Sequence, residues 1–241
     1  MLKILLNKIR KEVFLPTRLS ICINPVYIIR HGLHKAIVEL APKVKGDILD
    51  FGCGSKPYKS LFSHADSYVG VDLENTGHDH FDSQIDFYYD GRRLPFNDGS
   101  FDSVVCFEVL EHVFNIEEIL TEINRVLKPG GKLLLSIPFA WDEHEIPFDF
   151  ARYTSFGILD VLNKANFKVI DHLKTTTYVL AIFQLILAYV YQFLLPGKSV
   201  FMKVLRTVFI FPLNVIAIVF DFLLPKRYEY YCNNVVLVEK E

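Results

Sequence analysis

The sequence predicts an α/β fold built on a Rossmann-like, doubly wound, mostly parallel sheet of seven strands, with a hydrophobic helical insertion before the last strand. Three observations predict it. Short apolar segments of strand character alternate with amphipathic helical segments, a glycine-rich turn follows the first of these strands, and a strand-like segment returns near the end of the chain.

The elements are expected in the following order. A helix over 24–44, stopped by Gly46, leads into the first strand, and a short helix passes through residues 61 and 62. Asn115 is expected to cap a helix that Pro129-Gly130-Gly131 stops, and Thr154 caps the next one. The expected strands are 48–51, 68–71 with Asp72 at its end, 85–89, 101–107, 132–137, 167–173 and 233–238.

Composition narrows the class of protein. With 241 residues, 51% of them hydrophobic, the chain is long enough for one domain with appendages, and part of its apolar surface is expected to face something other than a core. A net charge of −2 disfavours a nucleic-acid partner. The four cysteines lack paired spacing, which indicates neither a disulfide framework nor a zinc site and favours a reducing, cytoplasmic setting.

Four segments make up the expected domain organisation. Residues 1–45 hold an amphipathic helix and a capping helix, 46–174 form the cofactor-binding core, 175–230 are a hydrophobic helical insertion, and 231–241 supply the last core strand. At the N-terminus, Leu2, Leu5, Leu6 and Ile9 recur at helical spacing opposite basic residues. This pattern is typical of an interfacial membrane helix or of a helix packed on its own domain, and a secretory signal is not indicated.

The turn after the first strand predicts a nucleotide-type cofactor. Gly52 and Gly54 let backbone N–H groups approach a ligand at the start of a helix, and Asp72 follows at the distance expected of a carboxylate that binds ribose hydroxyls. These features alone fit NAD as well as S-adenosylmethionine. Pro57 stands where a dinucleotide fingerprint has its third glycine or alanine, which disfavours NAD. Read singly, each glycine is also an ordinary turn and each aspartate a helix cap.

Residues 48–139 resemble the small-molecule branch of class I S-adenosylmethionine-dependent methyltransferases. The resemblance rests on several segments in order: Ile48 to Gly54, Val69 to Asp72, Asp90-Gly91 before Leu94-Pro95-Phe96, Phe101-Asp102, Glu108 to His112, and Arg125 to Gly131.

The resemblance implies a cofactor site and a strand direction. Asp50 and the glycine turn would hold the methionine end, Asp72 the ribose and Asp90 the adenine amino group, while Phe107 would line the adenine pocket. Their neighbours Cys53, Leu73 and Gly91 complete the predicted cofactor-binding set. The last strand would run antiparallel to its neighbours.

Candidates for the chemistry lie after the fourth and fifth strands. His112, close in sequence to Glu108 and Glu111, is a candidate general base, although a role in capping or packing the start of the following helix is favoured over it. The loop 141–153 is the preferred acceptor site. In it His144 or Glu145 would take the acceptor's proton, and the predicted substrate-binding residues are Trp141, Arg152 and Tyr153.

Other interpretations of this loop stay open or are disfavoured. Arg152 would hold an anionic or sugar group, or else pair structurally with Asp149. His78 and His80 together with His144 and Glu145 do not define a ligand geometry, so no metal is predicted. A phosphate-binding loop and an Asn-Pro-Pro-aromatic motif are absent from the sequence, which removes two competing enzyme classes.

The insertion predicts a membrane hairpin. No charged residue occurs from Thr175 to Gly197, and a second uncharged run extends from Thr207 to Phe220. Thr175 to Leu195 is long enough to span a bilayer, whereas Pro212 and Asn214 indicate a re-entrant or interfacial second run. The flanking basic residues suit a cytoplasmic face: Lys198, Lys203, Arg206, Lys226 and Arg227. A helical lid or a dimer interface is the alternative, and an oligomer is left open.

Together these features predict S-adenosylmethionine-dependent methyl transfer to a small-molecule, glycan or lipid-linked acceptor at the cytoplasmic face of a membrane, or in the cytoplasm if the insertion is not an anchor. The turn Ser55 to Tyr58 and the His144-Glu145 loop also resemble methyltransferases of bacterial envelope glycans. Two alternatives remain: a quinone or isoprenoid methyltransferase, and a non-catalytic membrane-bound subunit that keeps the cofactor pocket.

Overall fold

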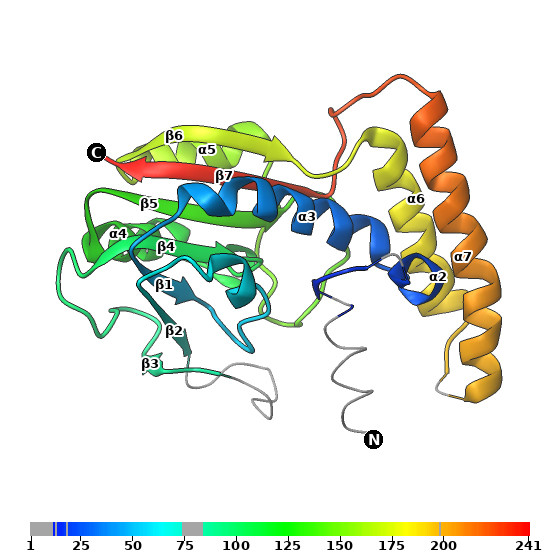
Figure 1. The fold of residues 1–241 in the computed structure, drawn as a ribbon, viewed down its shortest axis with the longest axis horizontal. Helices are drawn as coiled ribbons and strands as arrows, with labels where there is room; N and C mark the ends of the chain where they lie inside the picture. The colour runs from blue at the N-terminus through cyan, green and yellow to red at the C-terminus, as the bar shows by residue number, and fades with distance from the viewer. Residues whose placement is uncertain (1–11, 13, 18, 74–83, 198) are drawn as a thin grey trace. The chain divides into compact units, whose positions relative to one another are not determined.

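The chain divides into two compact units. The computed structural model describes residues 12, 14–17, 19–73, 84–197 and 199–241. The sheet unit comprises residues 36–173 and 234–241, and the helical unit comprises residues 1–35 and 174–233 (Figure 1). Most of the predicted interfacial helix lies outside the described residues, as do His78 and His80.

The sheet has seven strands in the order β3-β2-β1-β4-β5-β7-β6. It is mixed and mostly parallel, and Figure 1 draws β7 running opposite to β6. The predicted fold class is therefore confirmed. The strands are β1 (Asp47–Phe51), β2 (Ser67–Leu73), β3 (Phe87–Tyr89), β4 (Phe101–Phe107), β5 (Leu127–Pro138), β6 (Phe167–Lys174) and β7 (Asn233–Lys240).

The strand β1 lies at the centre of the parallel part, between β2 and β4. Leu49 pairs in register with Val69 on one side and Val104 on the other. Ile48 and Leu49 are fully buried, as expected of a strand covered on both faces. Since β1, β2, β3, β4 and β5 are parallel, their carboxyl ends meet at one edge, where open α/β sheets bind ligands.

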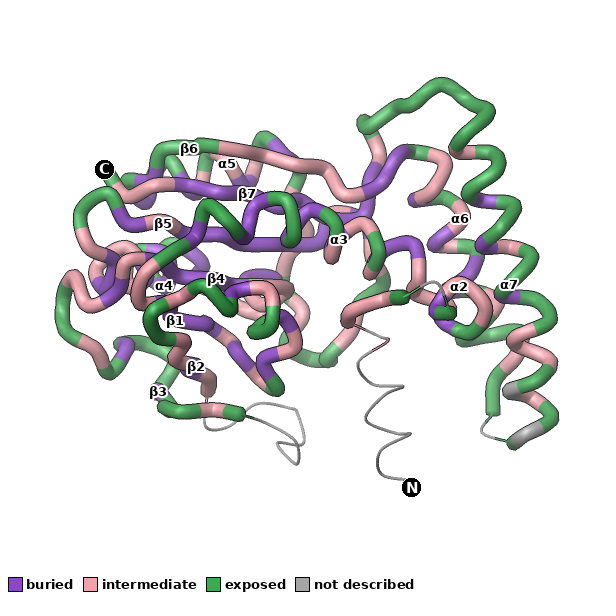
Figure 2. Tube along the Cα trace, in the orientation of Figure 1, coloured by how far each residue is buried: buried purple, intermediate pink, exposed green. Residues whose placement is uncertain are grey.

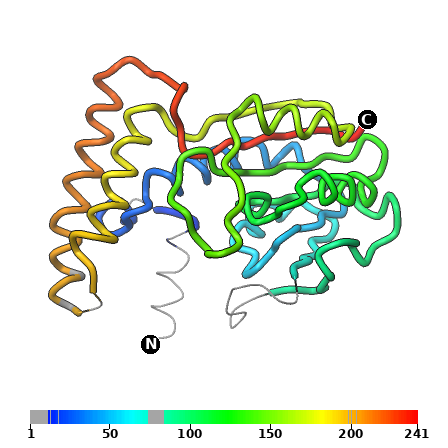
Figure 3. The backbone as a smooth tube through the Cα atoms, turned by 180° about the vertical axis from the view of Figure 1, so that it is seen from behind, coloured from blue at the N-terminus to red at the C-terminus, as the bar shows by residue number. Residues whose placement is uncertain are grey.

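Helices cover both faces of the sheet. Figures 1 and 3, which view it from opposite sides, show α4 (Ile116–Val126) and α5 (Ser155–Lys164) on one face. The last turn of α3 (Tyr27–Leu40) and the short helix η2 (Lys59–Phe62) lie on the other. The apolar side of α4 recurs at helical spacing and joins the sheet's main core: Ile116, Ile119, Leu120, Ile123 and Val126.

Two of the predicted helix ends need correction. The Asn115 side chain makes no capping hydrogen bond, and the acidic Glu117 and Glu118 in the first turn favour the helix N-terminus instead. The helix α4 ends at Val126 and β5 begins at once, before the proline and glycines, because Leu127 already pairs with Phe101. The predicted cap at Thr154 is confirmed, since its hydroxyl accepts a hydrogen bond from the Gly157 N–H at 3.1 Å.

In the helical unit the two apolar runs are opposite to the prediction: the second run, not the first, forms the long continuous helix. The first run forms the shorter helix α6 (Tyr178–Tyr189), which continues as a π-helical turn η4 (Val190–Leu194). The second run forms the long helix α7 (Val200–Leu223), and Pro212 lies inside it. A proline within a helix costs about 3 kcal/mol, so packing of α7 against α2 (Ser20–Ile23) and α6 outweighs that cost.

One stretch of α7, Val204–Leu223, is long and apolar enough to cross a membrane. Only 17% of its most apolar window is buried, and Figure 2 shows α7 mostly in the exposed colour. The few buried side chains form a small core with α3 and α6: Ile28, Leu187, Ile210 and Ala217.

Two buried side-chain amides link segments of the helical unit by hydrogen bonds. The Gln184 side chain is fully buried, donates to the Pro25 carbonyl at 2.9 Å and accepts from the Ile29 N–H at 3.0 Å. The equally buried Asn214 donates to the Ile21 carbonyl at 2.9 Å. The polar residues of the two apolar helices thus satisfy backbone groups from α2 to the first turn of α3, where helix ends leave such groups without partners inside the helix.

Replacing Gln184 by methionine is expected to lower the free energy of unfolding by about 1–3 kcal/mol. The substitution preserves the shape of the side chain but leaves the Ile29 N–H and Pro25 carbonyl unpaired in a buried site. Urea unfolding followed by circular dichroism measures the change. Gln84→Met, at an exposed position before β3, is the control; equal losses in the two variants would contradict the prediction.

Candidate active site

The turn after β1 presents backbone groups at the carboxyl edge of the sheet. The Gly52 and Cys53 N–H groups donate to the Val71 carbonyl at 2.9 and 3.2 Å, which ties the turn to β2. Beyond this point, the Gly54 N–H donates to the Asp72 carboxylate at 2.8 Å. The structure therefore joins the predicted glycine turn directly to the predicted ribose ligand.

The two glycines differ in what surrounds them. Gly52 has a φ of +69°, and a Cβ added to it would lie 2.4 Å from Cγ2 of Val109, so any other residue there would strain the backbone and displace Val109. Gly54 has a φ of +46°, but an added Cβ would meet no heavy atom within 4 Å. The position of Gly54 is thus an open cradle that a cofactor can fill.

The remaining predicted ribose and adenine ligands stand on β2 and just past β3. Asp72 also accepts from the Leu73 N–H at 2.8 Å, and a Cβ added to Gly91 would lie 3.3 Å from Cδ2 of Leu73. Asp90 is exposed, and the backbone N–H groups of Arg93 and Arg92 hold the pKa of its carboxyl below the usual value. Asp72 thus lies beside Gly54, and Asp90 follows Tyr89, which pairs with Leu73 at the end of β2.

Asp50 lies deeper than the rest of the predicted cofactor set. Its carboxylate is buried and accepts a hydrogen bond from the Tyr68 hydroxyl at 2.8 Å. Burial raises the pKa of Asp50 to about 7, although the Tyr68 hydrogen bond and the Lys56 ammonium favour the charged form. Burial also raises the pKa of the Cys53 thiol to about 12, so this cysteine is an inert wall of the turn.

Phe107 ends β4 within an aromatic group. Its ring packs edge-on against Tyr58, with centroids 5.2 Å apart, and stacks on Phe62 at 6.3 Å. Both partners come from the segment between β1 and β2. These contacts fix the ring at the carboxyl end of β4, and its role beside the adenine stays a prediction.

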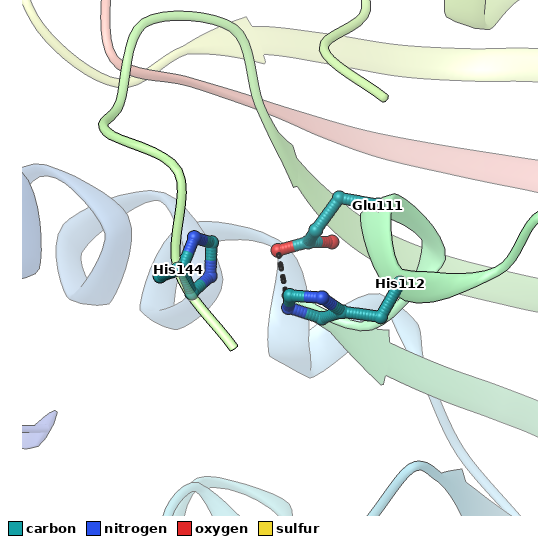
Figure 4. A group of neighbouring side chains, drawn as sticks. All are labelled: Glu111, His112 and His144. Atoms are coloured by element: carbon teal, nitrogen blue, oxygen red, sulfur yellow. Dashed lines mark ion pairs between the residues drawn. The ribbon is translucent and has the colours of Figure 1, made fainter. Parts of the chain in front are cut away.

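His112 and two acidic residues cluster after β4. His112 ends the short helix η3 (Leu110–His112). Its Nε2 atom lies 3.8 Å from Oε1 of Glu111 and 3.5 Å from Oε2 of Glu145. Figure 4 shows the His144 ring facing the same group, and the two histidine rings stand edge to face with centroids 4.8 Å apart. The structure thus brings the three predicted catalytic residues together.

The glutamates near His112 have unusual properties: two of them have a positive φ, and Glu111 is fully buried. Glu108 and Glu145 both have a φ of +55°, which non-glycine residues seldom adopt. The Ser136 hydroxyl donates to Glu108 at 2.7 Å. Burial, together with the neighbouring Glu108 carboxylate, raises the pKa of Glu111 well above its usual value. Strained backbone at two acidic residues of one cluster is typical of a functional site.

The acceptor loop 141–153 folds back on η3. The His112 Nδ1–H donates to the Phe148 carbonyl at 2.8 Å, while the Phe150 N–H donates to the Glu111 carbonyl at 2.9 Å. These bonds place His144 and Glu145 opposite the end of β4. Because the loop follows β5 and η3 follows β4, both parts of the cluster sit at the carboxyl edge of the sheet.

Arg152 holds this loop together through hydrogen bonds to other residues of the loop. Its guanidinium binds both carboxylate oxygens of Asp149, at 2.5 and 2.6 Å, and donates to the Asp142 carbonyl at 2.9 Å. It also donates to the Trp141 carbonyl at 3.4 Å. This arrangement is the structural pairing with Asp149, and holding an anionic acceptor would require Arg152 to exchange these bonds. Tyr153 packs against the main core.

Replacing Arg152 by glutamine is expected to raise hydrogen-exchange rates of amides in 141–153, the Phe150 N–H included, about 10- to 100-fold. Burial raises the pKa of Asp149, but the Arg152 hydrogen bonds and the His144 N–H outweigh burial and hold it at about 2, so Arg152 neutralises a fixed carboxylate. Hydrogen-exchange mass spectrometry measures the change. Lys164→Gln, which breaks the exposed pair with Asp160, is the control and should leave exchange unaltered.

The sequence alone did not identify several residues of the site. Glu111 was apparent only as a neighbour of His112, and its full burial is a tertiary property. Lys56 has a φ of 51°, is buried, and pairs with Asp86, whose carboxylate also accepts from the Gly70 N–H at 2.7 Å. A lysine two residues after Gly54 was the one available signal for this pair, and it does not reveal the partner.

Comparison with known proteins agrees with this arrangement. Residues 49–135 match the family model described as methyltransferase domain. A probable S-adenosylmethionine-dependent methyltransferase of Mycolicibacterium smegmatis is 29% identical over 153 residues, covering 58% of this chain and 60% of that protein. The O-methyltransferase cnsE of Penicillium expansum is 30% identical over 157 residues, covering 56% of each. The chain thus spans little more than half the length of these curated relatives.

Solved structures share the fold. The phosphoethanolamine N-methyltransferase 2 of Haemonchus contortus, in complex with S-adenosyl-L-methionine, has a TM-score of 0.53 at 18% identity, covering 87% of this chain and 52% of that one. The putative methyltransferase in a complex with the Haloferax volcanii Trm112 activator has a TM-score of 0.55 at 20% identity, covering 88% and 91%. Residues 49–135 thus match a methyltransferase domain, and the chain shares the fold of solved methyltransferases, one of which holds S-adenosyl-L-methionine.

Proposed function

We propose that this protein transfers the methyl group of S-adenosylmethionine to a lipid-linked or lipid-soluble acceptor. The observation that carries the first half of the proposal is the shared edge of the sheet. The open cradle at Gly54 follows β1, and the His112 cluster follows β4, the strand paired with β1. A cofactor on the first and an acceptor at the second would meet along one edge.

Methyl transfer asks little of the protein beyond positioning. A nucleophilic atom of the acceptor attacks the methyl carbon in line, the carbon–sulfur bond breaks, and its electron pair stays on sulfur, which yields S-adenosylhomocysteine. An acceptor hydroxyl must also lose a proton. His112, His144 and Glu145 stand together where that proton would leave, and we assign them the role of accepting it.

Exposed apolar side chains of the acceptor loop support a lipid-like acceptor. Ile146 is 75% exposed, and Phe148 and Phe150 are about half exposed, all on the loop that carries His144. Phe114, 78% exposed, packs edge-on against the Phe150 ring. Clustered exposed apolar side chains around a site mark a surface that meets apolar ligands or a membrane.

The names of several curated relatives agree with such an acceptor. They include a sterol 4-C-methyltransferase of Caenorhabditis elegans, a ubiquinone/menaquinone biosynthesis C-methyltransferase of Pseudoalteromonas translucida and a phthiotriol/phenolphthiotriol dimycocerosates methyltransferase of Mycobacterium ulcerans. Sterols and quinones are lipid-soluble. We therefore keep a quinone or isoprenoid as a proposed acceptor for this chain, together with a lipid-linked envelope glycan.

A membrane surface is the setting we propose for the reaction. The helix α7 exposes large apolar side chains along its length, among them Phe201, Val208 and Phe222 at 60% exposure or more. Arg206 on the same helix, with Lys226 and Arg227 after it, suits anionic headgroups at a cytoplasmic face. A dimer interface remains the alternative occupant of this apolar surface.

Labelled methyl transfer tests the proposal. Purified full-length protein is incubated with deuterated-methyl S-adenosylmethionine and a lipid extract, and mass spectrometry follows the products. We expect labelled lipid-linked sugars or labelled quinones, with S-adenosylhomocysteine formed in equal amount. Cofactor binding without any methylated product across lipid and water-soluble fractions would favour the non-catalytic subunit. A labelled product confined to water-soluble molecules would contradict the lipid acceptor.

A further inference from the structure

We propose that Glu111, His112 and His144 form a binding site for one divalent transition-metal ion, with Glu145 as a further ligand. One ligand atom from each of the first three residues lies within 4.8 Å of the others, and Figure 4 shows the three side chains converging. The part of this proposal in which the ion binds the acceptor rests on the proposed function, because we place the acceptor at the same cluster.

The hydrogen bonds of His112 fix which ring nitrogen is available. Its Nδ1 lies 2.8 Å from the Phe148 carbonyl, which can only accept, so Nδ1 carries the hydrogen. In the neutral ring Nε2 then presents a lone pair. That lone pair is buried and has no hydrogen-bond partner among the described residues, and it faces the oxygens of Glu111 and Glu145.

An electron pair facing two carboxylates is unfavourable unless a proton or a metal cation lies between them. The separations of 3.5 and 3.8 Å are too long for hydrogen bonds. They are close to the separation of two ligands on one ion, about 3.0–3.4 Å for metal–ligand bonds of about 2.1 Å. Both oxygens of the fully buried Glu111 also lack a hydrogen-bond partner among the described residues. The cluster therefore has unused donor atoms that point at a common space.

His144 has the outer contact that metal-binding histidines require. Its Nδ1 lies 3.2 Å from the Asp142 carbonyl, which can only accept, so this contact favours the tautomer with the hydrogen on Nδ1. The same nitrogen lies 3.3 Å from Oδ2 of Asp149, whose side chain is 4% exposed and is held by Arg152, and 3.3 Å from Nη2 of Arg152. A carboxylate on the second ring nitrogen orients a ligating imidazole and raises its basicity. The Arg152–Asp149 ion pair would therefore serve to hold the His144 ring in place.

Two imidazoles with one or two carboxylates suit Zn²⁺, Co²⁺ or Mn²⁺ better than Ca²⁺ or Mg²⁺, which prefer oxygen ligands throughout. Such an ion would leave a coordination position for an oxygen of the acceptor. A hydroxyl bound there loses its proton to solvent more readily than a free one, because the cation stabilises the alkoxide. With the ion bound, His112, His144 and Glu145 act on the hydroxyl through the ion, and this replaces direct acceptance of the proton by these side chains.

Cobalt titration of the tag-free full chain tests the site. Co²⁺ is added after chelator treatment, and the visible absorption of the bound ion and calorimetry report stoichiometry and affinity. We expect one ion per chain in the wild type, and at least tenfold weaker binding in His112→Ala, His144→Ala and Asp149→Asn. His34→Ala on α3 and the double variant His78→Ala/His80→Ala are controls and should bind as the wild type does.

The outcomes separate this inference from the proposed function. Circular dichroism establishes that each variant is folded, and His144→Gln replaces His144→Ala if the latter is not. Wild-type protein that binds no ion, or cluster variants that bind it unchanged, would overturn the metal site even where S-adenosylmethionine still binds. A chain that binds the ion but neither S-adenosylmethionine nor any acceptor would leave the metal site standing and overturn the proposed function.

Discussion

Gly54→Ala is expected to weaken S-adenosylmethionine binding about 100-fold while the protein stays folded. The added Cβ meets no protein atom within 4 Å, so it would project into the open cradle that the cofactor fills. Forcing a methyl group into a close contact costs about 1–3 kcal/mol, and each 1.4 kcal/mol is about a factor of ten in affinity. Isothermal titration calorimetry measures the loss.

Gly130→Ala is a matched control for this prediction. Gly130 also has a positive φ, +71°, and an added Cβ there also meets nothing within 4 Å. It lies near the start of β5, at the opposite end of the strands from the turn. Both variants thus bear a similar backbone penalty of about 1 kcal/mol, and only Gly54→Ala should lose cofactor affinity. Equal affinities in the two variants would show that the cofactor does not occupy the cradle.

Asp50→Asn is expected to make the cofactor-free protein more stable than the wild type, by an amount that grows with pH. The pKa of Asp50 is raised by burial from its ordinary value of 3.8 to about 7. A raised carboxyl pKa means that the folded state binds the proton more tightly than the unfolded chain. Its contribution to stability is therefore present below about pH 4 and is lost as pH rises towards 7.

The size of this effect follows from the shift. A shift of about 3 pKa units at about 1.4 kcal/mol each is on the order of 4 kcal/mol, an upper limit for a carboxyl that structural relaxation can partly solvate. Urea unfolding of both proteins at pH 4 and pH 8 measures it, and the gap between them should widen at the higher pH. A gap that is the same at both values would mean that Asp50 is not desolvated. Asparagine should also weaken binding of the cationic cofactor.

The strongly patterned parts of the fold were predictable from the sequence alone. Apart from Asp50 and Ser103, the buried residues of β1 and β4 are apolar, and the inward face of α4 repeats at helical spacing. Thr154 caps α5 as predicted, because a local side-chain bond to Gly157 needs no tertiary partner. Such features depend on neighbours in sequence, so the sequence reports them.

Features that depend on distant partners were not predictable. Pro212 suggested a broken second run, yet packing along α7 keeps the helix continuous through it. The approach of His144 to His112 needs the loop to fold back on η3, over a separation of more than thirty residues. The availability of the His112 Nε2 atom depends on a backbone carbonyl at Phe148. Spacing along the chain carries no record of these bonds.

The most direct test of this account is calorimetric titration of the full chain with S-adenosylmethionine, with NAD⁺ titrated in parallel. The glycine turn, the Asp72 carboxylate and the Asp90 carboxylate at one sheet edge predict one saturable site for S-adenosylmethionine, weakened in Gly54→Ala and retained in Gly130→Ala. NAD⁺ should give no heat of binding. Folded protein that binds NAD⁺, or that binds S-adenosylmethionine equally well in both glycine variants, would contradict it.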